Sequence, residues 1–401
     1  MDAGGVDALS AIDPATASVV IDLDAFRANL AALDAHIGDS ALMVVVKADG
    51  YGHGMLACAR AARSYGAPWL GVATPTEALT LRAAGDRGSL LAWLYGVDED
   101  LAPAVAADVD LSVSTTEQLS RTVAAAGVTE KSARIHLKID TGLSRNGARP
   151  ELWPELCAAA AEAEQTGAVQ VVGVWTHFAA ADEPDHPSVA VQTVGFDAAV
   201  EVARRAGLRP TLLHLANSAA ALILPAARRD LVRVGIAAYG IDPGPGIAAS
   251  VGVTLAPVMT LRAQLVLTKT VRAGDGVSYG HSWHASEPTT LGLVPLGYAD
   301  GVPRHAGNVA EVKFGTGRAP VRGRICMDQF VVELGPAAAA RAGDEVVLFG
   351  PGTAGEPTAA DWAEACGTIG YEIVTRVGSR VPRVYRGAVD ELEEGSDGRP
   401  R

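Results

Sequence analysis

The sequence predicts an α/β protein in which an N-terminal (β/α)8 barrel is followed by a mostly-β C-terminal domain. From about residue 40 to residue 235, apolar runs of four to six residues alternate with stretches of helical period, which is typical of βα units that feed a parallel sheet. After residue 246 the chain changes to short alternating runs broken by Gly and Pro, which indicates β-structure. A chain of 401 residues also exceeds one ordinary core, in agreement with two domains.

Eight apolar runs supply the predicted barrel strands. They are LMVVVK (42–47), WLGVA (69–73), SLLAW (89–93), VDLSV (109–113), RIHLKI (134–139), VQVVGV (169–174), TLLHL (211–215) and LVRVG (231–235). Helix start signals support the count, because Thr74, Pro75 and Glu77 predict a capping box and Gly85 a stop. We expect Asp24 to open an earlier helix. Its apolar face comprises Phe26, Leu30, Leu33 and Ile37.

The run SVVIDL (18–23) precedes the first barrel strand and has no place in an eight-stranded barrel. We expect it to pair with the C-terminal domain. The predicted organisation is a disordered N-terminus at 1–15, a barrel at 16–245, a β-domain at 246–386 and a flexible acidic tail at 387–401.

Charge and cysteine usage narrow the class of function. The chain has 33 basic and 46 acidic side chains, a net charge of −13, and no Lys/Arg cluster, which argues against nucleic acid as a partner. Its four cysteines lack the spacing of a zinc site or a disulfide framework, so we expect no metal and a reducing compartment. No segment is typical of a secretory signal or a membrane span. We therefore expect a cytoplasmic protein without membrane contact.

Lys47 closes the apolar run MVVV, at the carboxyl end of the first predicted barrel strand, where active sites of such barrels gather. A buried charged lysine is costly unless its pKa falls or its amine is covalently occupied, and a Schiff base with a carbonyl cofactor achieves both. In the following ADGYGHG loop the glycines allow backbone to approach a ligand, and Tyr51 can donate to a phosphate. The alternative is a lysine that simply reaches solvent.

The segment VVVKADGYGHG strongly resembles the pyridoxal-phosphate lysine motif of bacterial alanine racemases. The resemblance continues in family order from about residue 18 to 385, through HLKIDTGLSRNG, WTHFAAADE, HLANSAA, VRVGIAAYG, SYGHSW, GYADGVPR, ICMDQ and GYEIVTRVGSRVPR. It implies a TIM-like barrel that binds pyridoxal 5′-phosphate and an isomerase that interconverts L-alanine and D-alanine. It also implies that D-alanine is supplied to peptidoglycan synthesis.

The resemblance assigns roles to individual residues. Lys47 and Tyr279 match the two catalytic bases. The cofactor-binding set is Lys47, Tyr51, His177, Asn217, Ser218, Arg233, Gly235, Ile236 and Tyr371. The substrate-binding set is Arg145, Met327 and Asp328, with Lys138, His214, Tyr298 and Arg304 as supporting residues. By itself, Asn217-Ser218 after a strand is also an ordinary helix N-cap, a role compatible with anion binding at that N-terminus.

Arg233 lies between valines on the eighth predicted strand, and a guanidinium inside a barrel needs a partner. In the family the matching arginine faces the pyridine nitrogen of the cofactor. Because arginine does not hand over its proton, that nitrogen stays neutral and the cofactor is a weaker electron sink. This favours simple reprotonation at Cα over transamination. A structural arginine bonded to loop carbonyls or to His214 is the alternative.

Racemisation removes a proton from one face of a planar intermediate and delivers one to the other face. We expect Lys47 to serve one face and Tyr279 the other. In relatives this tyrosine and the Met-Asp pair, here Met327 and Asp328, reach the partner's cofactor across a two-fold dimer. The resemblance therefore implies a homodimer with shared active sites.

Lys138 and Arg145 are two cations seven residues apart, which would repel each other unless an anion intervenes. In relatives the matching lysine is often carbamylated by carbon dioxide, which supplies that anion. An unmodified lysine paired with Asp140 or another acid is the alternative.

Three other functions stay open at this point. A racemase for serine or for a broader set of amino acids is the nearest, because a pocket discriminates against one extra hydroxyl by only about 100-fold. A decarboxylase of the same two-domain plan usually carries a carboxylate where this chain has Arg233. A non-catalytic cofactor carrier would use the barrel alone.

Overall fold

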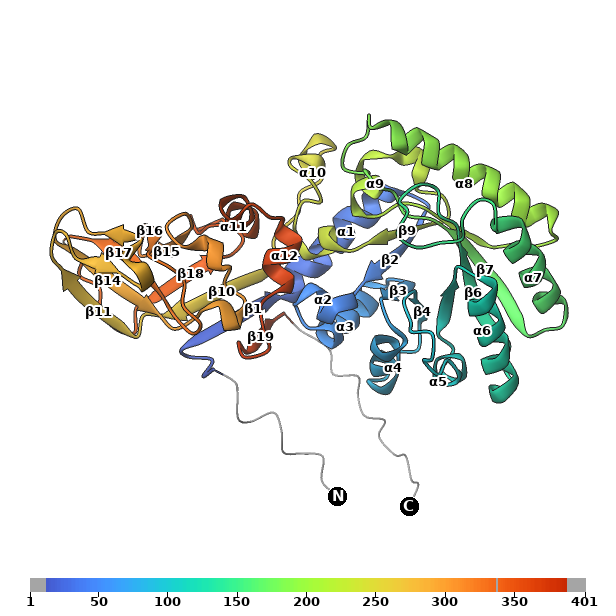
Figure 1. Ribbon diagram of the computed structural model, residues 1–401, viewed down its shortest axis with the longest axis horizontal. Helices are drawn as coiled ribbons and strands as arrows, with labels where there is room; N and C mark the ends of the chain where they lie inside the picture. The colour runs from blue at the N-terminus through green and yellow to red at the C-terminus, as the bar shows by residue number, and fades with distance from the viewer. Residues whose placement is uncertain (1–11, 337, 388–401) are drawn as a thin grey trace, which may run out of the picture. The chain divides into compact units, whose positions relative to one another are not determined.

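The computed structural model describes residues 12–336 and 338–387. These form two compact units, one of residues 28–59 and 66–256 and the other of residues 12–27, 60–65 and 257–387 (Figure 1). No helix in the described ranges is long and apolar enough to cross a bilayer.

The first unit is built on an eight-stranded parallel sheet in the order β8-β7-β6-β5-β4-β3-β2-β9. Its strands are β2 (Ala41–Val45), β3 (Trp69–Val72), β4 (Ser89–Ala92), β5 (Asp110–Val113), β6 (Ala133–Lys138), β7 (Val169–Trp175), β8 (Leu212–His214) and β9 (Leu231–Val234). Each strand overlaps one of the eight predicted apolar runs, which confirms the predicted barrel.

The ring of strands is nearly closed. No strand ladder joins β8 to β9, but two backbone hydrogen bonds cross this seam, from Asp230 N to Leu213 O at 3.2 Å and from Arg233 N to Ala216 O at 3.0 Å. The two segments therefore lie side by side, and Arg233 enters the barrel next to the carboxyl end of β8.

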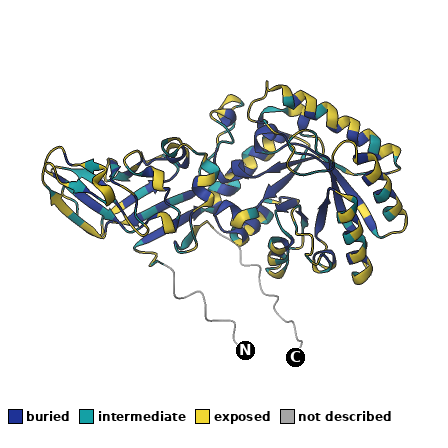
Figure 2. Ribbon diagram, viewed as in Figure 1, coloured by how far each residue is buried: buried dark blue, intermediate teal, exposed yellow. Residues whose placement is uncertain are grey.

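Helices connect the strands and expose their outer faces, whereas the strands are largely buried (Figure 2). The helical elements of this unit and its junctions are α1 (Leu23–Ile37), α2 (Lys47–Tyr51), α3 (Met55–Tyr65), α4 (Pro75–Ala83), α5 (Ala102–Ala106), α6 (Thr116–Thr129), α7 (Trp153–Gln165), α8 (Pro187–Arg205), α9 (Ser218–Ile223), η2 (Pro225–Ala227), η3 (Ile236–Tyr239) and α10 (Ile247–Ser250). The predicted capping box is present at α4, where the Thr74 hydroxyl accepts from Glu77 N and the Glu77 carboxylate accepts from Thr74 N, both at 3.2 Å.

The start of α1 differs from the expectation that Asp24 opens it. The helix begins at Leu23, and the Asp22 carboxylate accepts from Ala25 N at 2.9 Å. Asp22 therefore caps the helix, while Asp24 pairs with Arg27 one turn along. The predicted apolar face is buried. It comprises Phe26, Leu30, Leu33 and Ile37.

Apolar side chains fill the barrel interior below the polar strand ends. The cluster consists of Met43, Trp69, Leu91, Val172 and Leu231, with Ala41, Trp93 and Leu212 packed against it. Gly71 is required within it, because a Cβ there would lie 2.9 Å from both Met43 Sδ and the Trp93 ring. Burial of each of these large side chains contributes roughly 1.5–3 kcal/mol to the free energy of folding. The packed layer therefore supports the strand ends that carry the polar residues.

The second unit contains a nine-stranded sheet in the order β11-β14-β17-β16-β15-β18-β10-β1-β19, with a short β12–β13 hairpin. Its strands are β1 (Ala17–Asp22), β10 (Met259–Gln264), β11 (Leu267–Val271), β12 (Gly276–Val277), β13 (Trp283–His284), β14 (Thr289–Val294), β15 (Glu311–Phe314), β16 (Gly317–Arg322), β17 (Phe330–Gly335), β18 (Glu345–Phe349) and β19 (Arg383–Arg386). The helical elements are η4 (Tyr279–His281), η5 (Tyr298–Asp300), η6 (Arg304–Ala306), α11 (Ala359–Cys366) and α12 (Gly370–Thr375). Strand β1 pairs antiparallel with β10 and parallel with β19, which explains the apolar run that the barrel could not use.

Two boundaries of the expected organisation can be compared with the chain as described. The division between the units falls between Ala256 and Pro257, after α10, because Asn29 holds Ala256 by hydrogen bonds of 2.8 Å to its N–H and its carbonyl. Of the segment 1–15, only 12–15 are described, and they form a turn in which Asp13 O accepts from Thr16 N at 2.8 Å. The expectations for 1–11 and 388–401 lie outside the described residues.

Candidate active site

The backbone that follows Lys47 is left-handed over four successive residues. The φ angles are 53° at Ala48, 52° at Asp49, 61° at Gly50 and 53° at Tyr51. Three of these residues carry a Cβ, and each such residue costs on the order of 1 kcal/mol in this conformation. Strained backbone persists only where surrounding contacts stabilise it, and it is concentrated at functional sites. The strain therefore indicates a functional site at the carboxyl end of β2.

Side chains from neighbouring elements hold this loop in place. The Glu77 carboxylate, which also caps α4, accepts from Ala48 N at 2.7 Å. Asp49 accepts from Met55 N at 2.8 Å. The Tyr51 ring lies 4.9 Å from that of Tyr239, whose hydroxyl donates to Val45 O at 3.0 Å. One residue, Glu77, therefore fixes both the start of a helix and the exit of the lysine strand.

Four cations gather at this end of the barrel. Burial and the charge of Arg145 lower the pKa of Lys47, against an opposing effect of Glu77. Burial, Arg233 and Arg145 lower the pKa of Lys138 to about 7. Among the described residues, no carboxylate forms an ion pair with Lys47, Lys138, Arg145 or Arg233. The cluster is therefore prepared for an anion.

Arg233 is buried and almost fully hydrogen-bonded. One terminal nitrogen donates to His214 O at 3.0 Å and His214 Nδ1 at 3.1 Å. The other donates to Thr176 O and Leu215 O, each at 2.9 Å, and to His177 Nδ1 at 3.2 Å. Its Nε–H has no hydrogen-bond partner among the described residues. Burial lowers the pKa of Arg233 to about 9, so the guanidinium stays protonated at neutral pH.

The two histidines that accept from Arg233 are neutral. Burial and the Arg233 charge hold the pKa of His177, two residues past β7, well below its usual range. The same causes, with His136 and Lys138, act on the pKa of His214. Each Nδ1 accepts a hydrogen bond, so each ring carries its proton on Nε2.

Asn217, Ser218, Gly235 and Ile236 form the segment ends predicted to cradle a phosphate. Asn217 caps α9 by accepting from Ala220 N at 3.0 Å, as an ordinary N-cap would. The Ser218 hydroxyl accepts from Gly235 N at 3.0 Å, which joins the two loops after β8 and β9. A Cβ on Gly235 would lie only 2.2 Å from the Tyr51 hydroxyl. The tyrosine therefore reaches this cradle because residue 235 has no side chain.

Two family models match the amino-acid sequence of this chain over most of its length. Residues 21–243 match the alanine racemase N-terminal domain family, and residues 258–385 match the alanine racemase C-terminal domain family. The alanine racemase of Frankia casuarinae is 56% identical over 366 residues, which cover 91% of this chain and 95% of the relative. The chain belongs to the alanine racemase family.

Two solved alanine racemases agree with this assignment. The crystal structure of the enzyme from Streptomyces lavendulae has a TM-score of 0.92 at 51% identity and covers 94% of this chain and 98% of that one. The structure of the Bacillus anthracis enzyme, solved with bound L-Ala-P, has a TM-score of 0.85 at 32% identity and covers 94% and 97%. As a member of this family the protein is an isomerase.

The remaining site residues expected from the alanine racemase resemblance lie in the β-unit. Tyr279 begins η4 and is 71% exposed within the chain. Left-handed residues flank it, with φ of 60° at Ser278 and 69° at Gly280. The Ser278 hydroxyl donates to Arg324 O at 2.7 Å, which anchors the turn that presents the phenol.

Met327 and Asp328 lie on a loop fastened to the GYADG segment. Tyr298 N donates to Cys326 O at 3.1 Å, and Ala299 N donates to Met327 O at 3.0 Å. Gly297 permits this contact, since a Cβ there would lie 2.1 Å from Met327 O. Tyr298 is half-exposed in η5, Arg304 is exposed in η6, and Tyr371 is half-buried in α12.

The alternative was that Lys138 pairs with Asp140 or another acid, and no ion pair with an acid is present for Lys138 in the described part of the chain. Asp140 instead accepts from Gly142 N at 2.9 Å and Ser144 N at 3.1 Å, which shapes the loop that carries Arg145. The charge of Asp140 raises the pKa of Lys138, against the larger effects that lower it, without a direct ion pair.

Sequence reasoning missed three side chains that contact residues of this site or lie behind them. Trp175 lies under two of its cations, with Lys138 Nζ at 4.2 Å and the Arg233 guanidinium carbon at 4.8 Å from the ring centroid. His136 and Asp110 lie behind His214. The period-two alternation of RIHLKI was an available signal, because it places His136 and Lys138 on one face of their strand.

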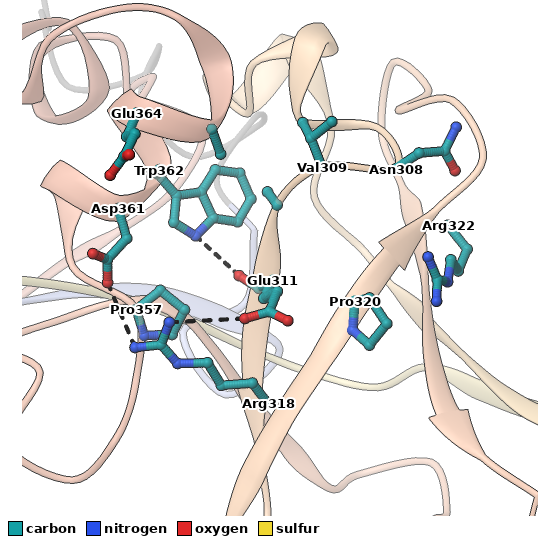
Figure 3. Close-up of a pocket in the computed structure, with 12 residues that line it drawn as sticks. Asn308, Val309, Glu311, Arg318, Pro320, Arg322, Pro357, Asp361, Trp362 and Glu364 are labelled. Atoms are coloured by element: carbon teal, nitrogen blue, oxygen red, sulfur yellow. Dashed lines mark hydrogen bonds and ion pairs between the residues drawn. The ribbon is translucent and has the colours of Figure 1, made fainter.

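A separate cavity of about 620 Å³ lies in the β-unit around Trp362 (Figure 3). Arg318, which lines this cavity, forms ion pairs with Glu311 at 3.8 Å and with Asp361 at 3.5 Å. The Trp362 indole donates to Glu311 O at 3.1 Å. None of the predicted site residues lines it. The cavity is therefore distinct from the candidate active site.

Proposed function

We propose that this protein interconverts L-alanine and D-alanine with pyridoxal 5′-phosphate held at the carboxyl end of the barrel, and that its D-alanine serves peptidoglycan synthesis. Lys47 and Tyr279 are the two bases. Family membership and the L-Ala-P bound by the Bacillus relative support the substrate. The observation that carries the proposal is the strained loop that presents Lys47 to a cluster of three further cations.

The residues at this end of the barrel fit the cofactor. A phosphate dianion suits the cation cluster, the Tyr51 hydroxyl, the loop amide at Ile236 and the Ser218 hydroxyl, which accepts from Gly235 N and can donate its own proton. The Arg233 Nε–H, left over by the protein's own hydrogen bonds, is the donor that we assign to the pyridine nitrogen. We assign ring stacking to His177. When bound, the cofactor supplies a conjugated carbonyl that withdraws electrons from the Cα–H bond of an amino acid.

Arg233 sets the extent of this activation. It donates to five protein acceptors and stays charged at neutral pH, so it donates a hydrogen bond without giving up a proton. A carboxylate at this position would instead favour a protonated ring nitrogen. The arginine therefore favours return of a proton to Cα over further chemistry, which distinguishes a racemase from a decarboxylase.

Lys47 acts on one face of the substrate. We assign to its Nζ the covalent attachment of the cofactor and, once released, the transfer of a proton at Cα. Burial and Arg145 lower the pKa of this amine, which increases the fraction available as a base at neutral pH. Arg145, exposed at the end of the β6 loop, is the residue that we assign to the substrate carboxylate.

Tyr279 acts on the opposite face, and we propose that it does so in a homodimer. Tyr279 is 71% exposed and Met327 is 54% exposed within one chain, so both side chains are available to a second copy. Met327 and Asp328 line the substrate side. We keep the roles that the family resemblance implies for the remaining residues, Tyr298 and Arg304 as supports of the entrance and Tyr371 as a phosphate ligand.

A chiral assay tests this proposal. Purified, cofactor-loaded protein incubated with L-alanine should give a racemic mixture. The Lys47→Ala variant should lose both the visible absorbance of bound cofactor and the racemisation, whereas Lys269→Ala, an exposed lysine of β11, should keep both. Racemisation retained by Lys47→Ala would refute the assignment.

The same preparation separates the alternatives. Faster turnover of serine, or comparable rates over a panel of amino acids, would point to a broader racemase. Carbon dioxide released from a basic amino acid would point to a decarboxylase. Bound cofactor without any turnover would point to a carrier.

A further inference from the structure

We propose that Asp110 and His136 are positioning residues that fix the tautomer of His214 and thereby hold Arg233 as a donor in the active site. This inference deepens the proposed function and rests on it for its kinetic part. Neither residue touches the assigned cofactor or substrate positions.

The side chains form a continuous buried chain across four barrel strands. Arg233 on β9 donates to His214 Nδ1 at 3.1 Å, and His214 on β8 lies 2.9 Å through its Nε2 from Nδ1 of His136 on β6. His136 Nε2 lies 3.1 Å from Asp110 Oδ2 on β5. His136 and His214 have no exposed surface, and Asp110 and Arg233 are 1% and 5% exposed.

A glycine makes this chain possible. Strand β7 lies between β6 and β8, and Gly173 is the β7 residue paired with His136. A Cβ at position 173 would lie 2.4 Å from His136 Nδ1. The His136 ring can therefore cross β7 to reach His214 only because residue 173 has no side chain.

The order of donors in the chain is determined at both ends. Arg233 can only donate, so His214 Nδ1 must accept and its proton resides on Nε2. His136 Nδ1 then accepts, which leaves the His136 proton on Nε2, where the Asp110 carboxylate accepts it. Arg134 fixes that carboxylate through hydrogen bonds of 2.7 Å and 3.1 Å to its two oxygens.

The opposite order would break the contact with Arg233. If His136 carried its proton on Nδ1, His214 Nε2 would become an acceptor and its remaining proton would sit on Nδ1, facing an Arg233 N–H. Two donors would then oppose each other in a buried site, which is strongly unfavourable. The Trp175 ring, stacked on that of His214 at 5.5 Å and 4°, prevents the imidazole from turning away.

The test uses the full-length, cofactor-loaded protein with ¹⁵N-labelled histidine. In the wild type, NMR should show His214 protonated on Nε2 alone, with assignment by His214→Gln. Asp110→Asn replaces an obligatory acceptor by an amide that can donate, so we expect a mixture of His214 tautomers. We also expect kcat to fall by about tenfold, the lower end of the loss seen when a metal-bound histidine loses its outer hydrogen-bond partner. Asp197→Asn, the same change at a surface pair with Arg229, should alter neither.

Gly173→Ala provides a second variant that keeps every titratable group. The added methyl should displace the His136 ring and give the same mixed tautomers. A wild-type His214 tautomer in both variants, with kcat unchanged, would overturn the inference. If wild-type His214 has a single tautomer but the protein does not racemise alanine, the proposed function is overturned. The inferred hydrogen-bond chain is then still supported.

Discussion

The amine nitrogen of Lys138 lies 4.2 Å from the centroid of the Trp175 ring, on the same ring that the Arg233 guanidinium approaches at 4.8 Å. An aromatic ring attracts a cation over its face, yet two cations approach this ring. Burial and the charges of Arg233 and Arg145 have a larger effect on Lys138 than the charge of Asp140, and they lower the pKa of its amine to about 7. The neutral amine is therefore accessible near neutral pH, and in that form Lys138 can act as a nucleophile.

We predict that Lys138 is carbamylated. The neutral amine attacks carbon dioxide, forms an N–C bond and releases one proton, which places a negative charge among Arg145, Arg233 and Lys47. Because only the neutral amine reacts, the modification should increase as pH rises through about 7. Protein equilibrated with ¹³C-labelled carbon dioxide should give a carbamate carbon signal that Lys138→Arg abolishes. No signal at pH 8 would contradict the prediction.

Gly235→Ala should weaken cofactor binding. The new Cβ would lie 2.2 Å from the Tyr51 hydroxyl, so the tyrosine must leave the cradle. Overpacking typically costs about 1–3 kcal/mol, so we expect the Kd for pyridoxal phosphate to rise by roughly tenfold or more. Absorbance titration measures this. Gly127→Ala, in helix α6 with open space around the added methyl, is the control and should leave the Kd unchanged.

Acid should destabilise the barrel in part through His214. Its pKa is held well below 6.5 in the fold, whereas the unfolded residue titrates near 6.5. Below pH 6.5 the unfolded chain therefore binds a proton that the fold does not, and stability falls by up to about 1.4 kcal/mol per pH unit. Above pH 6.5 this contribution to stability is fully present.

Urea unfolding at pH 8 and pH 5.5 checks the sign. The wild type should lose more stability between these pH values than His214→Gln, which lacks the titrating ring. His305→Gln, at an exposed position, should behave as the wild type. Equal losses in all three proteins would show that His214 is not responsible.

Arg380 should stabilise the loop that carries Asp328. Its guanidinium contacts buried Asp300 Oδ1 at 3.2 Å and Asp328 Oδ1 at 2.8 Å. Arg380→Gln leaves the Asp300 charge buried without a cation, so we expect a loss of about 2 kcal/mol at pH 7. The pKa of Asp300 is raised by burial, so the loss should shrink as pH falls toward 4.

Unfolding in urea at pH 7 and pH 4.5 measures this effect. Arg341→Gln, which removes an exposed pair with Asp344, should change stability by less than about 0.5 kcal/mol. An Arg380→Gln loss that is independent of pH would mean that Asp300 is not the group affected.

The sequence predicts the barrel well because its strands are buried on both faces and stand out as continuous apolar runs. All eight runs became strands, and the Thr74 capping box formed as predicted. The cap of α1 was misplaced by two residues because Asp22 and Asp24 are equally good caps and only the path of the backbone chooses between them. Boundaries of this kind depend on tertiary contacts.

The position of a site residue could be predicted where a charged side chain lies at or near the carboxyl end of an apolar strand, as for Lys47, Lys138 and Arg233. Asp110, His136 and Trp175 could not be assigned, because their importance arises from contacts between strands that are distant in sequence. The left-handed run after Lys47 was also invisible, since Ala48, Asp49 and Tyr51 do not favour that conformation. Such local conflicts are expected at functional sites.

The two-base mechanism places Lys47 and Tyr279 on opposite faces of one substrate. It is tested most directly by following deuterium entry at Cα from D2O in the Tyr279→Phe variant, starting separately from L-alanine and from D-alanine. The two-base mechanism predicts that racemisation is lost in both directions, while exchange with retained configuration persists for one enantiomer only, the one whose α-proton faces Lys47. Exchange of both enantiomers, or continued racemisation, would contradict it.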